Sequence, residues 1–245
     1  DDTDILVLPD GGLDYSKAHQ TVSSYDLNAL EIAVQLKEAH EDTTVYALSV
    51  GSPEIDDSKL KKGILAKGVD ELYFVADDDC AELSAYQTAA ALVSLIDQTG
   101  EFDLILCGDG SADNYAQQVD VQLAAALDVP IISSAIAIKL DDDSVEVTRL
   151  LENELQTVRA ALPAVISVVP DIAEPRIASM KDILAAGKKP QTMLGATSIG
   201  GVTASGVKTL SIKAPDAAPR KRELFNFTQE GDCDRFVAAV AAALR

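Results

Sequence analysis

The sequence predicts an α/β fold built on a doubly wound, mostly parallel sheet. Helix and strand patterns alternate along the first half of the chain, which is typical of a parallel sheet with helices on both faces. Two of the strand patterns, at residues 72–75 and 104–107, are almost entirely apolar, as strands covered on both faces should be. The chain has 245 residues, 47% of them hydrophobic, so it can bury a core as one large domain or two small ones.

The first half of the chain gives the predicted elements in order. Leu27, Leu30 and Val34 recur at helical spacing, so we predict a helix over residues 26–40 with Asp26 at its cap. The apolar run 44–50 precedes Gly51 and Pro53 and indicates a strand. The alternation continues with a helix over 58–66, a strand over 71–76, a helix over 84–97, a strand over 103–107 and a helix over 115–127.

After Pro130 the pattern changes to antiparallel additions. Residues 131–139 and 144–150 flank a turn and predict a hairpin, and residues 156–161 and 164–169 predict two further strands. A short helix follows near 180–186. Residues 195–218, rich in Gly, Ser, Thr and Ala, predict an extended arm, and residues 232–245 a final helix. We therefore expect an α/β domain over 1–190 and a C-terminal arm and helix over 191–245.

The charge of the chain excludes several classes of partner. Lys and Arg number 20 against 40 Asp and Glu, which gives a net charge of −20 and argues against binding to nucleic acid or to an anionic membrane. Aromatic residues make up 4% of the chain and Trp is absent, which disfavours a platform that stacks single-stranded bases. The excess acid is most simply explained by solubility or a salt-adapted surface, with a basic partner as the alternative.

Cysteine and histidine usage predicts neither a disulfide framework nor a zinc site, and it leaves metal chemistry without its main residues. Cys80, Cys107 and Cys233 are far apart, and neither His19 nor His40 has the spacing of a metal ligand. No segment approaches the roughly 20 apolar residues of a membrane-spanning helix, and the start of the sequence is acidic. We therefore expect a cytoplasmic protein without membrane insertion.

The segment 102–119 carries the strongest functional signal. A predicted strand ends at Cys107, a loop contains Gly108 and Gly110, and a helix is expected to open near Asp113. Free N–H groups at the carboxyl end of a parallel sheet favour phosphate, although the loop is neither a Walker motif nor the dinucleotide G-x-G-x-x-G. The alternative is a glycine-rich turn that feeds a helix capped by Asp113.

Two more strand ends are expected at the same rim. Residues 23–26 enter the first helix, and Val50 ends the second visible strand. Three such edges favour a nucleotide over a simple turn. As alternatives, Ser23, Ser24 and Asp26 can cap a helix, and Val50 can be a core residue.

Several segments of the chain resemble a known family. Residues 23–33 (SSYDLNALEIA), the segment 107–119, the run LPAVISVV at 162–169 with EPRIASMK at 174–181, and GKKP at 187–190 closely resemble the β subunit of electron transfer flavoproteins, nearest the FixA-like branch. The resemblance implies an adenine nucleotide α-hydrolase-like fold and a heterodimer with a flavin-bearing α subunit. It implies no general acid, base or nucleophile in this chain.

The resemblance also implies a nucleotide in this subunit. The nucleotide is AMP in the classical shuttling proteins and a second FAD in the bifurcating ones; branch resemblance favours FAD. The implied contacts are Ser23, Ser24, Tyr25, Asp26, Val50, Gly108, Asp109, Gly110, Ser111, Ala112, Asp113, Asn114, Tyr115, Ala116, Gln117, Gln118 and Val119. Gln117 and Gln118 are expected in the first turn of the helix, where neutral amides can bond phosphate or ribose. Asp109 and Asp113 are expected to turn outward, to cap, or to meet ribose hydroxyls.

A second implied site docks an acyl-CoA dehydrogenase-type flavoprotein. Its apolar anchor corresponds to Met180, with Ile183 and Leu184 behind it. Three lysines, Lys181, Lys188 and Lys189, predict a local basic patch there. The alternative is a small amphipathic core helix. The run 220–222 (RKR) is expected to be a solvated face or an arm contact with the α subunit.

Three departures from the family pattern matter. The family's first strand and its Lys-containing loop have no counterpart, and we expect the sequence to be a piece that lacks them; the alternative is a site that lacks one wall. Asp120 stands where the family usually has Gly, which questions how closely a nucleotide can approach. Leu150, beside Arg149, stands where the family often has a Glu that pairs with the flavin domain, which weakens the case for that ion pair.

The function expected from these observations is that of an electron carrier subunit. It would carry electrons, with its α subunit, between acyl-CoA dehydrogenases and other redox partners. If its nucleotide is FAD, we expect the complex to divide the two electrons of NADH between a low-potential and a high-potential acceptor. Two alternatives stay open: a nucleotide-binding hydrolase or stress-type domain that acts alone on ATP, and an assembly subunit with an empty pocket.

Overall fold

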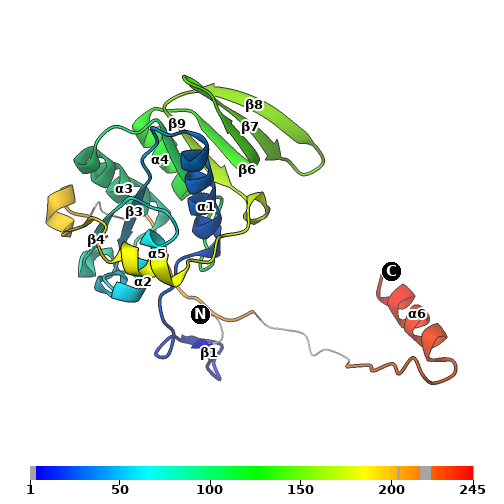
Figure 1. The fold of residues 1–245 in the computed structure, drawn as a ribbon. Helices are drawn as coiled ribbons and strands as arrows, with labels where there is room; N and C mark the ends of the chain where they lie inside the picture. Colours follow the sequence, from blue (N-terminus) through cyan, green and yellow to red (C-terminus); the bar gives the residue numbers. More distant parts are fainter. Residues whose placement is uncertain (1–3, 203–204, 216–221, 245) are drawn as a thin grey trace. The chain divides into compact units, whose positions relative to one another are not determined.

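The computed structural model describes residues 4–202, 205–215 and 222–244, and the chain divides into two compact units (Figure 1). The first unit comprises residues 1–4 and 18–210, and the second comprises residues 5–17 and 211–245. Each unit contains strands and at least one helix of its own.

The first unit contains two sheets. The smaller sheet has the order β10-β4-β3 and is wholly parallel: β3 spans Tyr46–Gly51, β4 spans Glu71–Ala76 and β10 spans Gln191–Leu194. The larger sheet has the order β5-β9-β6-β7-β8. Its strands are β5 (Leu104–Gly108), β6 (Ile131–Leu140), β7 (Ser144–Leu150), β8 (Leu155–Ala161) and β9 (Ala164–Val168). Strands β5, β9 and β6 are parallel, and β7 and β8 continue the sheet in antiparallel pairs.

These strands confirm the predicted fold class, with one difference. The expected single sheet is divided, because β3 and β5 are edge strands of separate sheets. The expectation that the family's first strand is missing from this sequence stays a prediction.

In the described part of the first unit, five helices cover the sheets. They are α1 (Ser24–Ala39), α2 (Ser58–Leu65), α3 (Ala85–Thr99), α4 (Val119–Leu127) and α5 (Met180–Ala186). Short 3-10 turns follow four of the strands, at Pro53–Ile55, Asp78–Cys80, Pro170–Ile172 and Ala196–Ile199. No helix among the described residues has the length and apolar character that a membrane crossing requires.

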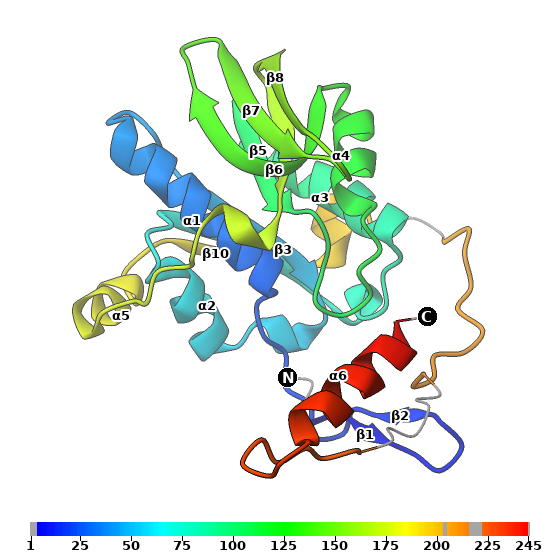
Figure 2. The same ribbon diagram turned by 90° about the vertical axis from the view of Figure 1, so that its right-hand side faces the viewer.

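Strand β9 is buried along its whole length between two helices. Ala29 of α1 packs in one cluster with Ala164, Ile166 and Val168, which share one face of β9. On the other face the hydroxyl of Ser167 donates to Asp120 of α4. Alternate residues of a strand point to opposite faces, so α1 and α4 cover opposite sides of the larger sheet (Figure 2). This arrangement is the doubly wound architecture that the apolar strand patterns predicted.

Most predicted elements exist with bounds shifted by one or two residues. The predicted strand at 71–76 and the helix at 180–186 match β4 and α5. The helix predicted from residue 115 is wrong at its start, since α4 begins at Val119. Strand β10 was missed, because four residues after a proline carry little pattern before they pair with β4.

The arm predicted for residues 195–218 is wrong at its beginning. Ala196 and Ile199 are 2% and 5% exposed and pack in a cluster with Val75 and Leu95. The chain therefore stays part of the first unit well beyond the end of β10. That residues 191–245 form an arm against an α subunit stays a prediction.

The second unit contains a small hairpin and the last helix. The hairpin strands are β1 (Leu6–Val7) and β2 (Leu13–Asp14), and the N–H of Ala214 donates to the carbonyl of Gly11 at 2.9 Å. The predicted last helix is confirmed as α6, which spans Asp232–Ala243. The ring of Phe236 lies 5.6 Å from Phe225 and 5.5 Å from Phe227. Within the run 220–222, residues 220 and 221 lie outside the described residues.

Candidate functional site

The candidate site begins where β5 ends against the first turn of α1. The N–H of Gly108 donates to the Oδ1 of Asp26 at 3.1 Å, and the N–H of Asp109 donates to the carbonyl of Val168 at 3.0 Å. A Cβ on Gly108 would lie 2.5 Å from the Cβ of Tyr25 and 2.9 Å from its carbonyl carbon. Only glycine permits this approach of α1 to the end of β5.

Residues 109–118 form an irregular loop and not the start of a helix. Tyr115 and Gln117 have φ angles of 44° and 52°, which a right-handed helix does not allow. The prediction that Asp113 caps a helix is therefore wrong, and so is the placement of Gln117 and Gln118 in its first turn. Gln118 is the N-cap residue of α4, and Gln117 lies before it.

Side chains within the loop fix this conformation. The carboxylate of Asp113 accepts the Ser111 hydroxyl and, at 2.6 Å, the N–H of Asn114. The ring of Tyr115 lies over Gly110, where an added Cβ would be 2.4 Å from the ring. These contacts use the small size of Gly110 and explain how a tyrosine adopts a left-handed backbone here.

The ring of Tyr115 also lies 5.5 Å from the ring of Tyr25 in α1. The loop is thereby joined to the same helix turn that meets Gly108. The structure thus brings residues 23–26 and the loop 108–119 together, as the sequence predicted.

Val50 lies elsewhere. It is half-buried in β3 and packs in the cluster that contains Val75 and Ala196, which agrees with the core alternative for its side chain. Its contact with a nucleotide stays a prediction.

Two helices open at this rim without a side-chain cap. Neither Ser23 at α1 nor Gln118 at α4 makes a side-chain cap hydrogen bond. By contrast, Asp57, Ser84 and Ser179 cap α2, α3 and α5. The first-turn N–H groups of α1 and α4 therefore remain available to a ligand, together with the positive end of each helix dipole.

Two buried polar atoms at the rim have no hydrogen-bond partner among the described residues. They are the Oγ of Ser23 and the Oδ1 of Asp109, a residue only 9% exposed. Burial, and then the nearby carboxylate of Asp120, raise the pKa of Asp109. Buried polar atoms are nearly always paired in folded proteins, so a water or a polar ligand at the rim would satisfy this pair. Of the three alternatives for Asp109, an outward side chain is wrong, and contact with ribose hydroxyls stays a prediction.

Asp120 does not project into the loop 109–118. It is 6% exposed, and its Oδ2 accepts the Ser167 hydroxyl at 2.6 Å beneath α4. The carboxylate therefore faces the sheet. Burial, followed by the carboxylates of Asp120 and Asp26, raises the pKa of the nearby Cys107 thiol. Cys107 is therefore protonated at neutral pH and is a poor nucleophile.

An apolar surface lies on and before α5. We call Ile177, Met180, Ile183 and Leu184 the α5 patch; they are 97%, 73%, 39% and 72% exposed. The buried residue of α5 is Ala186, so the core-helix alternative does not hold for Met180, Ile183 or Leu184. The predicted basic patch is smaller than expected, because the Nζ of Lys189 donates inward to the carbonyl of Leu65 at 2.9 Å. Lys181 and Lys188 are exposed.

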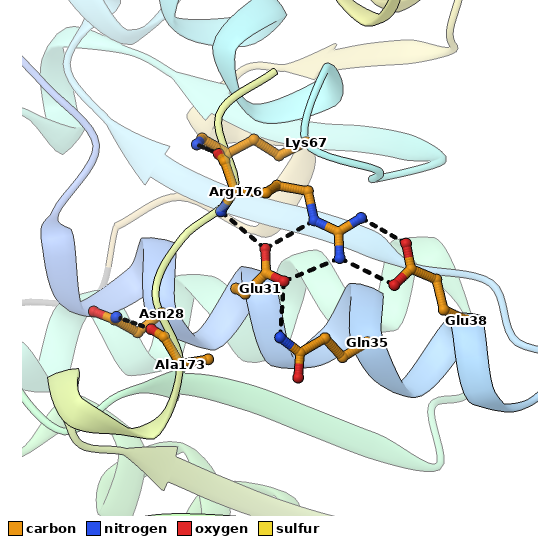
Figure 3. Close-up of polar contacts among 7 residues, drawn as sticks. All are labelled: Asn28, Glu31, Gln35, Glu38, Lys67, Ala173 and Arg176. Carbon is orange, nitrogen blue, oxygen red and sulfur yellow. Dashed lines mark hydrogen bonds and ion pairs between the residues drawn. The ribbon is translucent and has the colours of Figure 1, made fainter. Parts of the chain in front are cut away.

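Sequence reasoning missed the contact that holds the chain before this patch. Figure 3 shows Arg176 between two carboxylates of α1, Glu31 and Glu38. Glu31 is 4% exposed, although it is charged. The sequence contained one indication of this contact, a glutamate among the apolar positions of a helix. Such a residue predicts a buried cationic partner but does not identify the partner.

The sequence matches the electron transfer flavoprotein domain over residues 12–198, which is more than half of the chain. The chain belongs to the electron transfer flavoprotein family. We call residues 23–26 with Gly108 and Asp109 the Gly108 rim. The match spans this rim, the loop before α4, Arg176 and the α5 patch.

Family membership makes a flavin plausible as the cofactor of this electron transfer flavoprotein chain and implies that it works with a second subunit and with other flavoenzymes. A metal centre has no support among residues 4–202, 205–215 and 222–244, where no group of three or more His, Cys, Asp or Glu side chains converges.

Proposed function

We propose that this chain is the β subunit of an electron transfer flavoprotein and binds an adenine nucleotide at the Gly108 rim. The supporting observation is the convergence of two uncapped helix starts and two unpartnered buried polar atoms at one end of the larger sheet. The N–H groups of α1 and α4 suit a phosphate, and the hydroxyl of Ser23 can donate to one.

The residues at the rim fit a nucleotide in a particular way. Asp109 is an acceptor and repels phosphate, so we place it against a ribose hydroxyl, which can donate to it. The loop residues Ser111 and Asp113 are engaged with each other and with Asn114. Phosphate recognition would then rest on backbone N–H groups, in a chain whose net charge is −20.

We propose FAD as this nucleotide, with AMP as the alternative and a further FAD in the α subunit. Bound FAD would accept and release electrons, whereas AMP would only complete the fold. The chain's own residues would bind and orient the nucleotide. With FAD here, the heterodimer would divide the electrons of NADH between two acceptors, in the cytoplasm.

Counting cofactors in the purified heterodimer tests this proposal. The complex is denatured, and the released FAD and AMP are quantified by chromatography and absorbance. We expect two FAD for each heterodimer. One FAD with one AMP would refute bifurcation and keep the β-subunit assignment. A homodimer that binds ATP without an α subunit would refute the assignment and favour the stand-alone hydrolase.

We further propose that the α5 patch docks an acyl-CoA dehydrogenase-type flavoprotein. Four apolar side chains exposed to water in so short a segment are typical of a protein–protein contact, and Met adapts to a partner pocket. Replacing Met180 by Ala should leave flavin content unchanged and raise the apparent KM for a medium-chain acyl-CoA dehydrogenase reduced with octanoyl-CoA. Unchanged electron transfer would refute this docking assignment.

A further inference from the structure

One face of α1 carries a row of polar side chains that bind the segment after β9. The row consists of Asn28, Glu31, Gln35 and Glu38, which recur at helical spacing (Figure 3). Asn28 is 5% exposed, and its Nδ2 donates to the carbonyls of Pro170 at 2.8 Å and of Ala173 at 2.6 Å. These two hydrogen bonds fix the beginning of the segment 170–176 on α1.

Arg176 fixes the end of the same segment. Its backbone N–H and its Nε donate to the Oε2 of Glu31 at 3.0 Å and 2.8 Å, and its Nη2 donates to the Oε1 of Glu31 at 3.0 Å. Its Nη1 donates to the Oε1 of Glu38 at 2.6 Å. We call Arg176 with these two glutamates the Arg176 clamp. Because the guanidinium is planar and rigid, these bonds set the direction of the chain as well as its position.

The partners of the clamp are themselves held. Gln35 donates to the Oε1 of Glu31 at 2.9 Å, and the Nζ of Lys67 donates to the carbonyl of Arg176. The side chain of Glu31 is 6% exposed, whereas that of Glu38 is 59% exposed. One carboxylate therefore forms the buried part of the clamp and the other its solvent-facing part.

The clamp stands directly before the α5 patch. Ile177, the next residue, is 97% exposed, and Met180 follows one residue after the Ser179 cap. At the other end of the patch, Ala186 is fully buried and Lys189 bonds to the carbonyl of Leu65. The patch is thus anchored on both sides, while the side chains between the anchors face water.

We propose that Arg176 is a positioning residue for partner docking: its clamp on α1 holds the α5 patch in the orientation that the partner flavoprotein binds. This inference rests on the docking function proposed above. A surface that is ordered before binding loses less conformational entropy when the partner arrives, so the clamp lowers the cost of docking. Arg176 itself need not touch the partner.

A double-mutant cycle in the flavin-loaded heterodimer tests the inference. Arg176→Gln removes the clamp and Met180→Ala removes the proposed anchor. We expect Arg176→Gln to raise the apparent KM for octanoyl-CoA-reduced medium-chain acyl-CoA dehydrogenase about tenfold, since freeing one or two side chains costs about that factor. The kcat at saturating dehydrogenase and the flavin content should not change. In the Met180→Ala background, Arg176→Gln should add little, because both variants act on the same contact.

Two variants control for loss of the fold. Glu38→Gln weakens the clamp on its solvent side and leaves the buried Glu31 pair intact, so it should raise the KM in the same direction by a smaller factor. Arg159 of β8 forms an ion pair with Asp141 at 2.9 Å, and Arg159→Gln removes this pair. It should leave the KM unchanged.

Amide hydrogen exchange gives a readout that needs no partner. Residues 177–182 should exchange faster in Arg176→Gln than in the wild type, while β9 should exchange at the wild-type rate. Unchanged exchange at 177–182 would overturn the inference. So would an unchanged KM in Arg176→Gln when Met180→Ala raises it, or additive effects of the two variants. If Met180→Ala itself has no effect, the docking function fails and the inference fails with it.

Discussion

Replacing Glu31 by Gln should lower the free energy of unfolding more than the loss of an exposed charge would. The glutamine keeps the shape of the side chain but removes the negative charge that faces Arg176. Hydrogen bonds from Arg176 outweigh burial and lower the pKa of Glu31 from its usual 4.5 to about 2. A tenfold change in a proton-binding constant corresponds to about 1.4 kcal/mol, so the ionised carboxylate stabilises the fold by roughly 3 kcal/mol at pH 7.

The pH dependence gives the sign of this effect. The pKa of Glu31 is lower in the folded than in the unfolded chain. Its stabilising contribution is therefore complete above about pH 4.5 and disappears as the pH falls towards about 2. The difference in free energy of unfolding between wild type and Glu31→Gln should be largest at pH 7 and should shrink steadily below about pH 4.5.

Urea unfolding at several pH values and one fixed protein concentration measures this difference. Glu41→Gln, which changes an exposed glutamate in the turn after α1, is the matched control and should change stability by less than about 0.5 kcal/mol. The reasoning is refuted if Glu31→Gln is as mild as this control at pH 7. A large difference that does not depend on pH would show that packing, and not charge, makes Glu31 important.

Two further predictions concern the Gly108 rim. Gly108→Ala should destabilise the protein by about 2 kcal/mol and lower its nucleotide content, because the new Cβ would lie 2.5 Å from that of Tyr25. Gly63→Ala in α2, where a Cβ meets nothing within 4 Å, should instead stabilise by about 0.5–1 kcal/mol, and thermal unfolding that ranks the two alike would contradict the first prediction. Asp109→Asn removes a buried carboxylate whose Oδ1 has no partner among the described residues and whose pKa is raised, so it should stabilise the nucleotide-free protein by about 1 kcal/mol at pH 7. The gain should vanish in acid, where wild-type Asp109 is protonated, and nucleotide should bind more weakly if Asp109 accepts from ribose.

The sequence predicted best where local pattern and buried position agree. Strand β4 could be read from its apolar run because both of its faces are covered. The same logic placed Gly108 at the carboxyl end of β5 and brought it to the start of α1, since α/β topology decides where strand ends meet.

The loop before α4 could not be read in this way. Residues 115–118 have helix-compatible types, yet Tyr115 and Gln117 take left-handed angles, with the ring of Tyr115 packed over Gly110 and beside Tyr25. That conformation depends on α1, which lies far away in the sequence. The Arg176 clamp could not be predicted for the same reason, since 145 residues separate Arg176 from Glu31 and no local pattern joins them.

The three cysteines differ in a way that makes the chain convenient to label. Cys80 is 3% exposed, and burial, and then the carboxylate of Asp77, raise the pKa of its thiol. Cys107 is likewise held protonated, whereas Cys233 is exposed on α6. A maleimide dye should therefore modify the native protein at Cys233 alone. One fluorophore would then report on the second unit without any substitution.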